Sequence, residues 1–235
     1  MTAPATTDKV VEVRDLQVAY AEDAPLVLDG VTLAVDRGDV TCIVGGSGCG
    51  KSTLLKAIIG LVPPRAGVVQ LLGESLYELA EDKRDSLLQR VGVMFQYGAM
   101  LGSLTVGENV GLALQMHTSA EPGLVQDVVD AWLERVGLAG SANKMPSELS
   151  GGMRKRAALA RAMALEPEIL FCDEPGAGLD PITAAGIDRL LLTLNERQAT
   201  TLVVVTHELL SIERLDGRLV MLEGGLVIYD GTARE

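Results

Sequence analysis

A glycine-rich run that ends in a lysine and a serine is the part of this sequence with the clearest chemical use. The run comprises Gly45, Gly46, Ser47, Gly48, Cys49, Gly50, Lys51 and Ser52, and Thr53 follows it. It matches the P-loop pattern G-x-x-x-x-G-K-[ST] at every required position. Glycines allow several backbone N–H groups to face one anion, and a helix N-terminus adds partial positive charge. Lys51 is then placed to reach β- and γ-phosphates, and the Ser52 hydroxyl to ligate Mg²⁺.

The flanking residues favour this interpretation over the alternative, a glycine-rich turn with an incidental lysine. Residues 40–44 form an apolar run typical of a buried strand, and residues 53–59 have helical periodicity up to Gly60. A strand before the loop and a helix after it are the context that a P-loop requires. The sequence therefore predicts a site for a nucleoside triphosphate.

A pair of acidic residues, Asp173 and Glu174, follows the continuous apolar run 169–172. An aspartate at a strand end can hold Mg²⁺ through water, and a glutamate beside it can orient the water that attacks a γ-phosphate. The alternative is an ordinary acidic turn after a strand. The P-loop in the same chain favours the catalytic interpretation.

Alternating strand and helix patterns indicate an α/β fold with a mostly parallel sheet, whose C-terminal strand ends would bring these residues together. Strands are predicted at residues 10–13, 16–20, 31–35, 40–44, 68–72, 91–95, 169–172 and 201–206, with a hairpin at 219–230. Helices are predicted at residues 53–59, 81–90, 108–115, 122–136, 150–165 and 182–197, and from Glu208. The first strands suggest an antiparallel β layer. The helical patterns between about 97 and 165 predict a helical subdomain inserted in the α/β core.

The composition fits one domain. The chain has 235 residues, of which 1–8 are expected to be disordered and 9–235 to form the domain. A net charge of −12 with few aromatic residues argues against a nucleic-acid partner. The three cysteines form no C-x-x-C pair, which is typical of a reducing compartment. No apolar run approaches the roughly 20 residues that cross a bilayer.

A third motif, Leu149-Ser150-Gly151-Gly152-Met153, indicates the family. Ser150 suits a helix N-cap, and the glycines permit close approach of backbone N–H groups to a phosphate. On this motif, the P-loop and the acidic pair, the chain resembles the nucleotide-binding subunit of an ABC transporter, whose signature is Leu-Ser-Gly-Gly. The resemblance covers residues 10–231. It implies a P-loop NTPase core with an antiparallel β layer and an inserted helical subdomain, which binds and hydrolyses ATP with Mg²⁺.

The resemblance also implies a homodimer that shares its two sites. Ser150, Gly151 and Gly152 of one subunit would bind the γ-phosphate of the ATP on the P-loop of the other. Single matches are Tyr20 for stacking on adenine, Gln96 for sensing Mg²⁺ and water, Asp180 for the dimer interface and His207 for the γ-phosphate. Without the resemblance, Tyr20 could equally be an ordinary core or surface residue, and His207 could be a structural residue. The implied catalytic residues are Lys51, Gln96, Glu174 and His207, and the implied Mg²⁺ ligands are Ser52, Gln96 and Asp173.

Within that family, four segments are similar to the ATPases of phospholipid transporters that work with MCE-domain proteins (the Mla family). They span residues 95–101, 104–110, 145–153 and 178–182. The first of them lines, in the family, the groove that receives a coupling helix of the permease, and Met100, Leu101 and Leu104 offer apolar contacts. The implied partners are permease subunits, an MCE-domain protein and a small accessory subunit.

The implied location is the cytoplasmic face of the inner membrane, where the chain would be peripheral. Since the sequence ends at Glu235, we expect no C-terminal extension of the kind that holds accessory proteins in some members. The alternatives are the ATPase of an amino-acid importer, of a lipoprotein or drug exporter, or a non-transport ABC ATPase.

Overall fold

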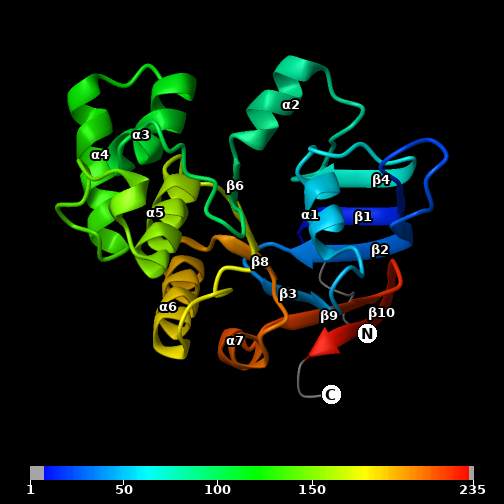
Figure 1. Ribbon diagram of the computed structural model, residues 1–235. Coiled ribbons are helices and arrows are strands. Elements are labelled where there is room, and N and C mark those ends of the chain that lie inside the picture. The colour runs from blue at the N-terminus through cyan, green and yellow to red at the C-terminus, as the bar shows by residue number, and fades with distance from the viewer. Residues whose placement is uncertain (1–7, 233–235) are drawn as a thin grey trace, which may run out of the picture.

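The computed structural model describes residues 8–232, which form two β-sheets with helices packed around them (Figure 1). The six-stranded sheet has the order β10-β9-β3-β8-β7-β6, and the four-stranded sheet has the order β2-β1-β4-β5. The strands are β1 Lys9–Val18, β2 Leu28–Asp36, β3 Val40–Gly45, β4 Ala66–Leu71, β5 Glu74–Ser75, β6 Val91–Met94, β7 Ile169–Asp173, β8 Thr201–Val205, β9 Arg218–Glu223 and β10 Leu226–Thr232. The helices are α1 Lys51–Ile58, α2 Glu81–Leu88, α3 Val106–His117, α4 Pro122–Arg135, the 3₁₀ helix η1 Pro146–Glu148, α5 Gly151–Met163, α6 Pro181–Gln198 and α7 Leu209–Leu215. The predicted α/β class with an antiparallel β layer is confirmed.

The centre of the larger sheet is parallel and buried on both faces. Every residue of β7 and β8 is buried, and β8 pairs in parallel with β7 on one side and with β3 on the other. Strands covered on both faces are continuous apolar runs rather than alternating ones, which explains their sequence pattern. Because these strands run in parallel, the residues that follow them meet at one edge of the sheet.

The first strand differs from the predicted pair of short strands at 10–13 and 16–20. β1 is continuous, and its register against β2 shifts between Val13 and Leu16. Asp15 has a φ of 48°, and this bulge lets both flanking apolar residues stay buried. The bulge breaks the alternation of apolar residues, and the sequence pattern therefore resembles a turn. Of the segment 1–8 that was expected to be disordered, all but Asp8 lies outside the described residues.

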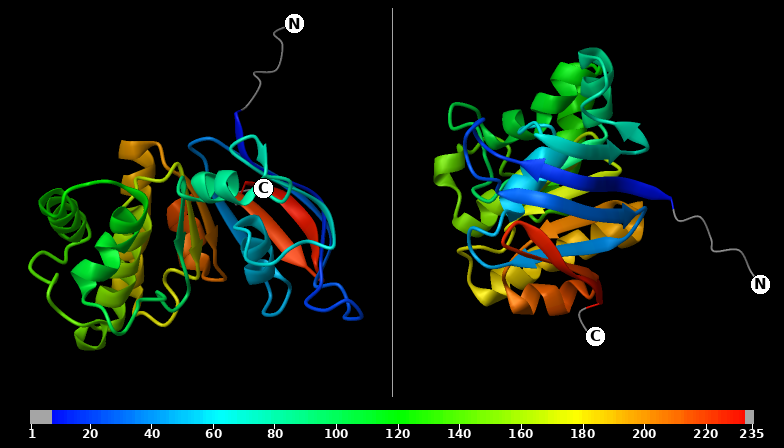
Figure 2. Two further views of the ribbon diagram at one scale, coloured as in Figure 1. Left: turned by 90° about the horizontal axis from the view of Figure 1, so that it is seen from above. Right: turned by 90° about the vertical axis from the view of Figure 1, so that its right-hand side faces the viewer.

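Helices cover opposite faces of the larger sheet. Alternate residues of β3 face two different hydrophobic cores: Cys42 and Val44 pack with α3, α4, α5 and α6, whereas Ile43 packs with α1 and the smaller sheet. Figures 1 and 2 show α5 and α6 on one side of this sheet and α1 on the other. Two helix N-termini, those of α1 and α5, are thus separated by the sheet within one chain.

Helices α3, α4 and α5 occupy the chain between β6 and β7, where the sequence predicts a helical subdomain. Helix α3 begins at a capping box, in which Glu108 N donates to Thr105 Oγ1 and Thr105 N donates to Glu108 Oε2. Helix α4 anchors the group through Trp132, which is 1% exposed. In the part of the chain that the structure describes, none of the helices has the length and apolar character needed to cross a membrane.

Candidate active site

The loop between β3 and α1 is held in shape by its neighbours. Gly45 has a φ of 149°, and a Cβ there would lie 2.2 Å from the Leu222 carbonyl oxygen. Gly50, the N-cap of α1, has a φ of 106°, and a Cβ there would lie 2.6 Å from Leu28 Cδ2. Glycine alone fits both positions without strain. The residues 46–48 between them are exposed, so the loop presents its backbone to solvent at the start of a helix.

Lys51, the first residue of α1, folds its ammonium back over this loop. Its Nζ donates to Gly45 O and Gly46 O, each at 2.9 Å, and the residue is 9% exposed. These carbonyls satisfy the hydrogen bonds of a nearly buried cation at the position where the loop would face an anion. A phosphate oxygen is a stronger acceptor for an ammonium than a neutral carbonyl, so the lysine is ready to bind one.

Ser52 connects the loop to the end of β7. Its Oγ donates to Asp173 Oδ1 at 3.3 Å. Burial raises the pKa of Asp173, and the hydrogen bond from Ser52 partly opposes this shift. A hydroxyl and a carboxylate side by side are the hard oxygen donors that Mg²⁺ prefers, and a cation would offset the desolvation of the carboxylate.

Glu174 and His207 meet at the ends of neighbouring strands. Glu174 follows β7 and His207 lies just after β8, and His207 Nδ1 is 2.7 Å from Glu174 Oε1. The other carboxylate oxygen, Oε2, is buried and has no hydrogen-bond partner among the described residues. Such an oxygen is costly unless it accepts a hydrogen bond from a ligand or a water molecule. The pair therefore combines an oriented carboxylate with one free acceptor.

Tyr20 lies beyond the end of β1 and beside the start of α1. Its hydroxyl is 2.9 Å from Thr53 Oγ1, and the residue is 59% exposed. Of the two alternatives left open by the sequence, a core position is excluded. A fixed and exposed aromatic ring next to the glycine-rich loop between β3 and α1 is suited to stacking on the base of a nucleotide.

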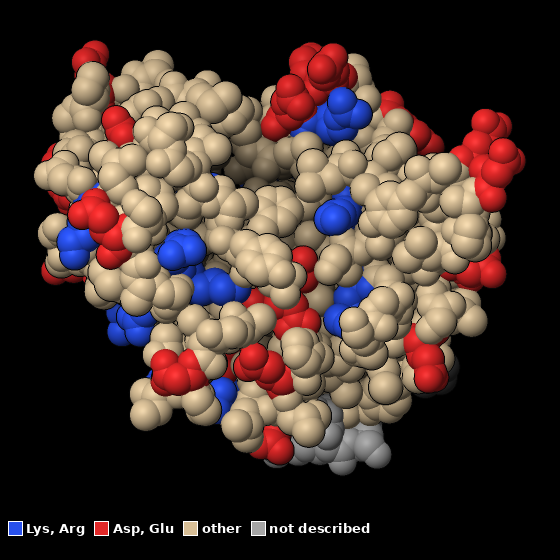
Figure 3. All heavy atoms as spheres, in the orientation of Figure 1, with Lys and Arg blue, Asp and Glu red and all other residues tan. Residues whose placement is uncertain are grey.

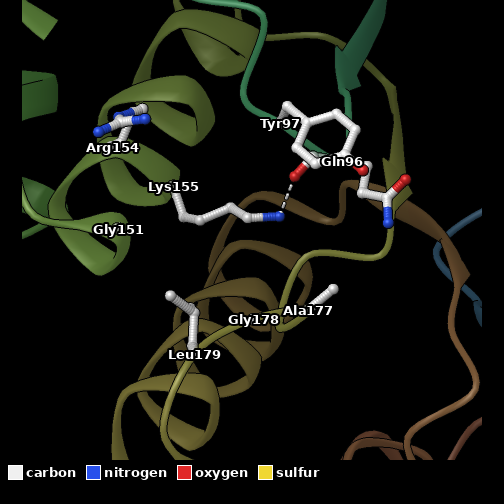
Figure 4. A pocket seen from close by; sticks show the side chains of 8 residues that line it. All are labelled: Gln96, Tyr97, Gly151, Arg154, Lys155, Ala177, Gly178 and Leu179. Atoms are coloured by element: carbon white, nitrogen blue, oxygen red, sulfur yellow. Dashed lines mark hydrogen bonds between the residues drawn. The ribbon is translucent and has the colours of Figure 1, made fainter. Parts of the chain in front are cut away.

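Gln96 follows β6 at the same edge of the sheet, since β6 pairs in parallel with β7. It borders a pocket of about 430 Å³, shown in Figure 4. The other residues that line the pocket are Tyr97, Gly151, Arg154, Lys155, Ala177, Gly178 and Leu179. The pocket thus lies between the residues after β6, the first turns of α5 and the loop after Glu174.

The predicted residues Ser150, Gly151 and Gly152 lie apart from the P-loop of the same chain. Ser150 is the N-cap of α5, and its Oγ accepts a hydrogen bond from Met153 N at 3.3 Å. Helix α5 packs on the face of the sheet opposite to α1. Asp180 caps α6 in the same way, because its Oδ1 accepts from Ile182 N and Thr183 N.

Two cations of α5 that sequence reasoning missed hold the segment after β6. Lys155 Nζ donates to Gln96 O, and the Arg161 guanidinium donates to Gly98 O at 2.9 Å and to Ala99 O at 2.5 Å. For Lys155 a signal existed: it shares the apolar face of its helix with Leu159, which is fully buried. A lysine at such a position requires buried partners.

Comparison with known proteins agrees with this geometry. A profile of the ABC transporter family matches residues 28–177. This chain belongs to the ABC transporter family. It carries the ATP-hydrolysing domain of that family, and solved ABC cassettes share its fold.

Individual ABC proteins are similar to this chain to different extents. The probable ribonucleotide transport ATP-binding protein mkl of Mycobacterium leprae is 38% identical over 84% of this chain and 56% of its own length. The methionine import ATP-binding protein MetN of Brucella abortus is 36% identical over 97% of this chain and 61% of its own length. The chain therefore spans 56% to 61% of the length of these relatives. The dimeric ATP-binding cassette MJ0796, in a post-hydrolysis state bound to ADP and Pi, is 31% identical with a TM-score of 0.87, over 96% of this chain and 99% of that chain.

Proposed function

We propose that this ABC protein powers transport through a membrane permease, using ATP bound at the P-loop edge of its larger sheet. The observation that carries the proposal is the convergence at that edge of Lys51, the Ser52–Asp173 pair and the Glu174–His207 pair. Lys51 binds the β- and γ-phosphates, together with the N–H groups of the loop.

The residues present fit Mg²⁺. Ser52 Oγ and Asp173 Oδ1 lie 3.3 Å apart, and Gln96 supplies an amide oxygen from the neighbouring strand end. Bound Mg²⁺ would neutralise charge that develops on the phosphates. Asp173, whose pKa is raised by burial, is stabilised in its ionised form by any cation held beside it.

For hydrolysis, Glu174 accepts a proton from the attacking water through Oε2, the oxygen that has no hydrogen-bond partner among the described residues. His207 fixes the other oxygen of that carboxylate. The side chain of His207 is 64% exposed, so the far edge of its ring can contact a γ-phosphate. Tyr20 stacks on adenine at the other end of the nucleotide.

A second copy of the chain completes the site. Ser150, Gly151 and Gly152 open α5, and their backbone N–H groups make a second anion site on the face of the sheet opposite to Lys51. Because the two anion sites of one chain lie on opposite faces of its sheet, a single ATP cannot contact both. An ATP on the P-loop of one chain can contact the N-terminus of α5 only if a partner chain supplies that helix. The dimer of MJ0796 with ADP and Pi supports such an assembly. The resemblance to the family would place Asp180 near its interface.

The permease would bind at a groove between β6, α3 and α5. This groove has a volume of about 350 Å³, and Figure 3 shows the surface hollowed between α2 and α3. Its apolar lining residues are Val91, Val93, Leu112, Ala113, Met116, Ala162 and Leu165. Beside it, Leu101 is 46% exposed, and its backbone N–H and C=O are both bonded to the buried Asn109 side chain. The groove therefore has a fixed apolar rim suited to an apolar helix.

For the substrate, we favour phospholipid moved between membranes, with an MCE-domain protein and a small accessory subunit, at the cytoplasmic face of the inner membrane. The segments 95–101, 104–110, 145–153 and 178–182, which resemble the ATPases of such systems, support this choice. A second candidate is an amino-acid importer. The methionine import protein MetN, 36% identical over 97% of this chain, favours it.

One purification distinguishes these candidates. The tagged chain is isolated from the membranes of its own cells in mild detergent, and the proteins that copurify are identified by mass spectrometry. The complex is then reconstituted into vesicles, and ATP-dependent transfer of labelled phospholipid and uptake of labelled methionine are measured. We expect a permease with an MCE-domain protein and phospholipid transfer. Methionine uptake would support the second candidate, and ribosomal proteins without any permease would overturn the transport function.

A further inference from the structure

Lys155 is a buried lysine whose ammonium joins two functional segments. It is 7% exposed, and its Nζ donates to the backbone carbonyls of Gln96 and Glu174, the latter at 2.9 Å. Figure 4 shows its side chain crossing from α5 to the segment Gln96–Tyr97. Burial lowers the pKa of Lys155, and neighbouring acidic groups oppose the shift. Burying the Lys155 ammonium costs free energy, and the hydrogen bonds to the carbonyls of Gln96 and Glu174 offset part of that cost.

The carbonyl of Glu174 belongs to a residue with a strained backbone. Glu174 has a φ of 50°, in the left-handed region that non-glycine residues seldom adopt. Such a conformation persists only where the surroundings impose it. Here Glu174 N donates to Val205 O at 2.8 Å, and Glu174 O accepts from Lys155. The turn that aims the carboxylate toward His207 is therefore fixed at one end by β8 and at the other by α5.

The other carbonyl is that of Gln96, which lies in the loop after β6. That loop also has two residues with positive φ, Gly98 at 76° and Ala99 at 47°. Their carbonyls accept hydrogen bonds from Arg161, which lies on the same helix as Lys155. Helix α5 thus holds the loop at three carbonyls, and of these two cations Lys155 is the one that also bonds to the residue after β7.

We propose that Lys155 is a positioning residue for ATP hydrolysis. It holds the backbones of Gln96 and Glu174 at fixed positions relative to α5. The proposal rests on the role proposed above for Glu174. Because Ser150 caps the N-terminus of α5, a phosphate bound there and the residue that carries the catalytic carboxylate are connected through the Lys155 side chain. Lys155 acts on hydrolysis through its neighbours and leaves the P-loop untouched.

The test compares four variants of the full chain by steady-state ATPase activity over a range of ATP concentrations. Lys155→Met keeps most of the length of the side chain but removes its ammonium group, and we expect kcat to fall by about tenfold or more while KM stays within about threefold. Lys155→Arg retains a cation with several donors and is expected to keep about a third of the activity or more. Lys155→Gln, a milder change with a shorter donor, should lie between them. Lys83→Met, at an exposed lysine of α2, is the matched control and should behave as wild type.

A double substitution separates positioning from a packing role. In a Glu174→Gln background, Lys155→Met should cause little further loss of kcat if it acts through Glu174. An equal loss in both backgrounds, an unchanged kcat, or a raised KM alone would overturn the proposal. Melting temperature and ATP binding are measured for every variant, and Lys155→Gln and Lys155→Arg decide the question if Lys155→Met does not fold. If Glu174→Gln keeps its activity, Glu174 is not the general base and the proposed function fails at that residue. The kcat of Lys155→Met in the wild-type background then still tests whether Lys155 positions Gln96.

Discussion

His207 Nδ1 lies 2.7 Å from Oε1 of Glu174, and the second oxygen of that carboxylate has no partner among residues 8–232. The two oxygens therefore have different uses. One fixes the orientation of the group, and the other is left to accept a hydrogen bond from a water molecule or substrate. A general base needs both a fixed orientation and an oxygen that is free to accept a proton.

Glu174→Gln is expected to preserve ATP binding and to lower the rate of hydrolysis by about 10²–10⁴-fold, the typical contribution of a general base. The amide has the same shape and can still contact His207, but it cannot take a proton from water. Steady-state ATPase activity measures the loss, and sedimentation with ATP should show a persistent dimer. Glu78→Gln, at an exposed glutamate, is the control. Hydrolysis within tenfold of wild type would remove Glu174 from this role.

The proposed site shared between two subunits predicts complementation between two inactive variants. Lys51→Ala damages the P-loop half of each site, and Ser150→Arg damages the other half. Each homodimer then has two broken sites, whereas a mixed dimer has one intact site. We expect tight ATP binding to recover in the mixture, measured by equilibrium binding, and hydrolysis to recover as well if one site suffices. A mixture that binds ATP no better than either variant alone would contradict a dimer in which each ATP site is shared by the two subunits.

Asp173→Asn is expected to raise the melting temperature of the nucleotide-free protein at pH 7 by a few degrees. Burial raises the pKa of Asp173 in the folded state, so ionisation of this carboxylate costs stability. Below the unfolded pKa of about 3.9 both states are protonated and the cost is absent; it grows as pH rises from that value to the higher folded pKa and is complete above the folded pKa. The gain should therefore shrink toward acidic pH. Mg²⁺-ATP should stabilise the wild type more than the variant. A variant less stable than wild type at pH 7 would show that the bond from Ser52 to the carboxylate outweighs its desolvation.

Much of this site is local in sequence, and for that reason it could be predicted. The P-loop and the acidic pair each follow a buried strand directly, and parallel pairing alone brings the ends of β3, β7 and β8 together. Lys155 could not be predicted in the same way. Its partners are backbone carbonyls 59 and 19 positions away, and a carbonyl acceptor requires no particular residue type. The bulge at Asp15 escaped prediction because its φ of 48° lies on a non-glycine residue.

Leu101→Asp should weaken the binding of the chain to its permease and leave ATP binding by the isolated subunit intact. Leu101 is 46% exposed, so the carboxylate does not disturb the core of the free subunit, but it would be desolvated against an apolar partner. We expect copurification of the permease to fall about tenfold or more. Leu124→Asp, at an exposed leucine of α4, is the control. A large drop in the melting temperature of the Leu101→Asp subunit would instead assign Leu101 to the fold of the helical segment.

Cys49 should be the first cysteine to react with a maleimide. It is partly exposed in the P-loop, and its Sγ lies 3.9 Å from the Lys51 ammonium. Cys42 and Cys172 are buried on β3 and β7, where burial raises the pKa of both thiols, that of Cys42 to about 12. Maleimides react with the thiolate, so these two should react only after unfolding.

The adduct on Cys49 would occupy the space beside the P-loop and Lys51 where the phosphates of ATP are proposed to bind. Modification should therefore abolish ATP binding and hydrolysis together. Mg²⁺-ATP should slow the reaction, because the bound phosphates cover the loop. Mass mapping of labelled peptides with and without nucleotide measures both effects, and Cys49→Ser should remove the fast phase of labelling. Labelling of Cys42 or Cys172 ahead of Cys49 would mean that the larger sheet opens more readily than its burial indicates. A rate at Cys49 that is indifferent to ATP would place the nucleotide away from this loop.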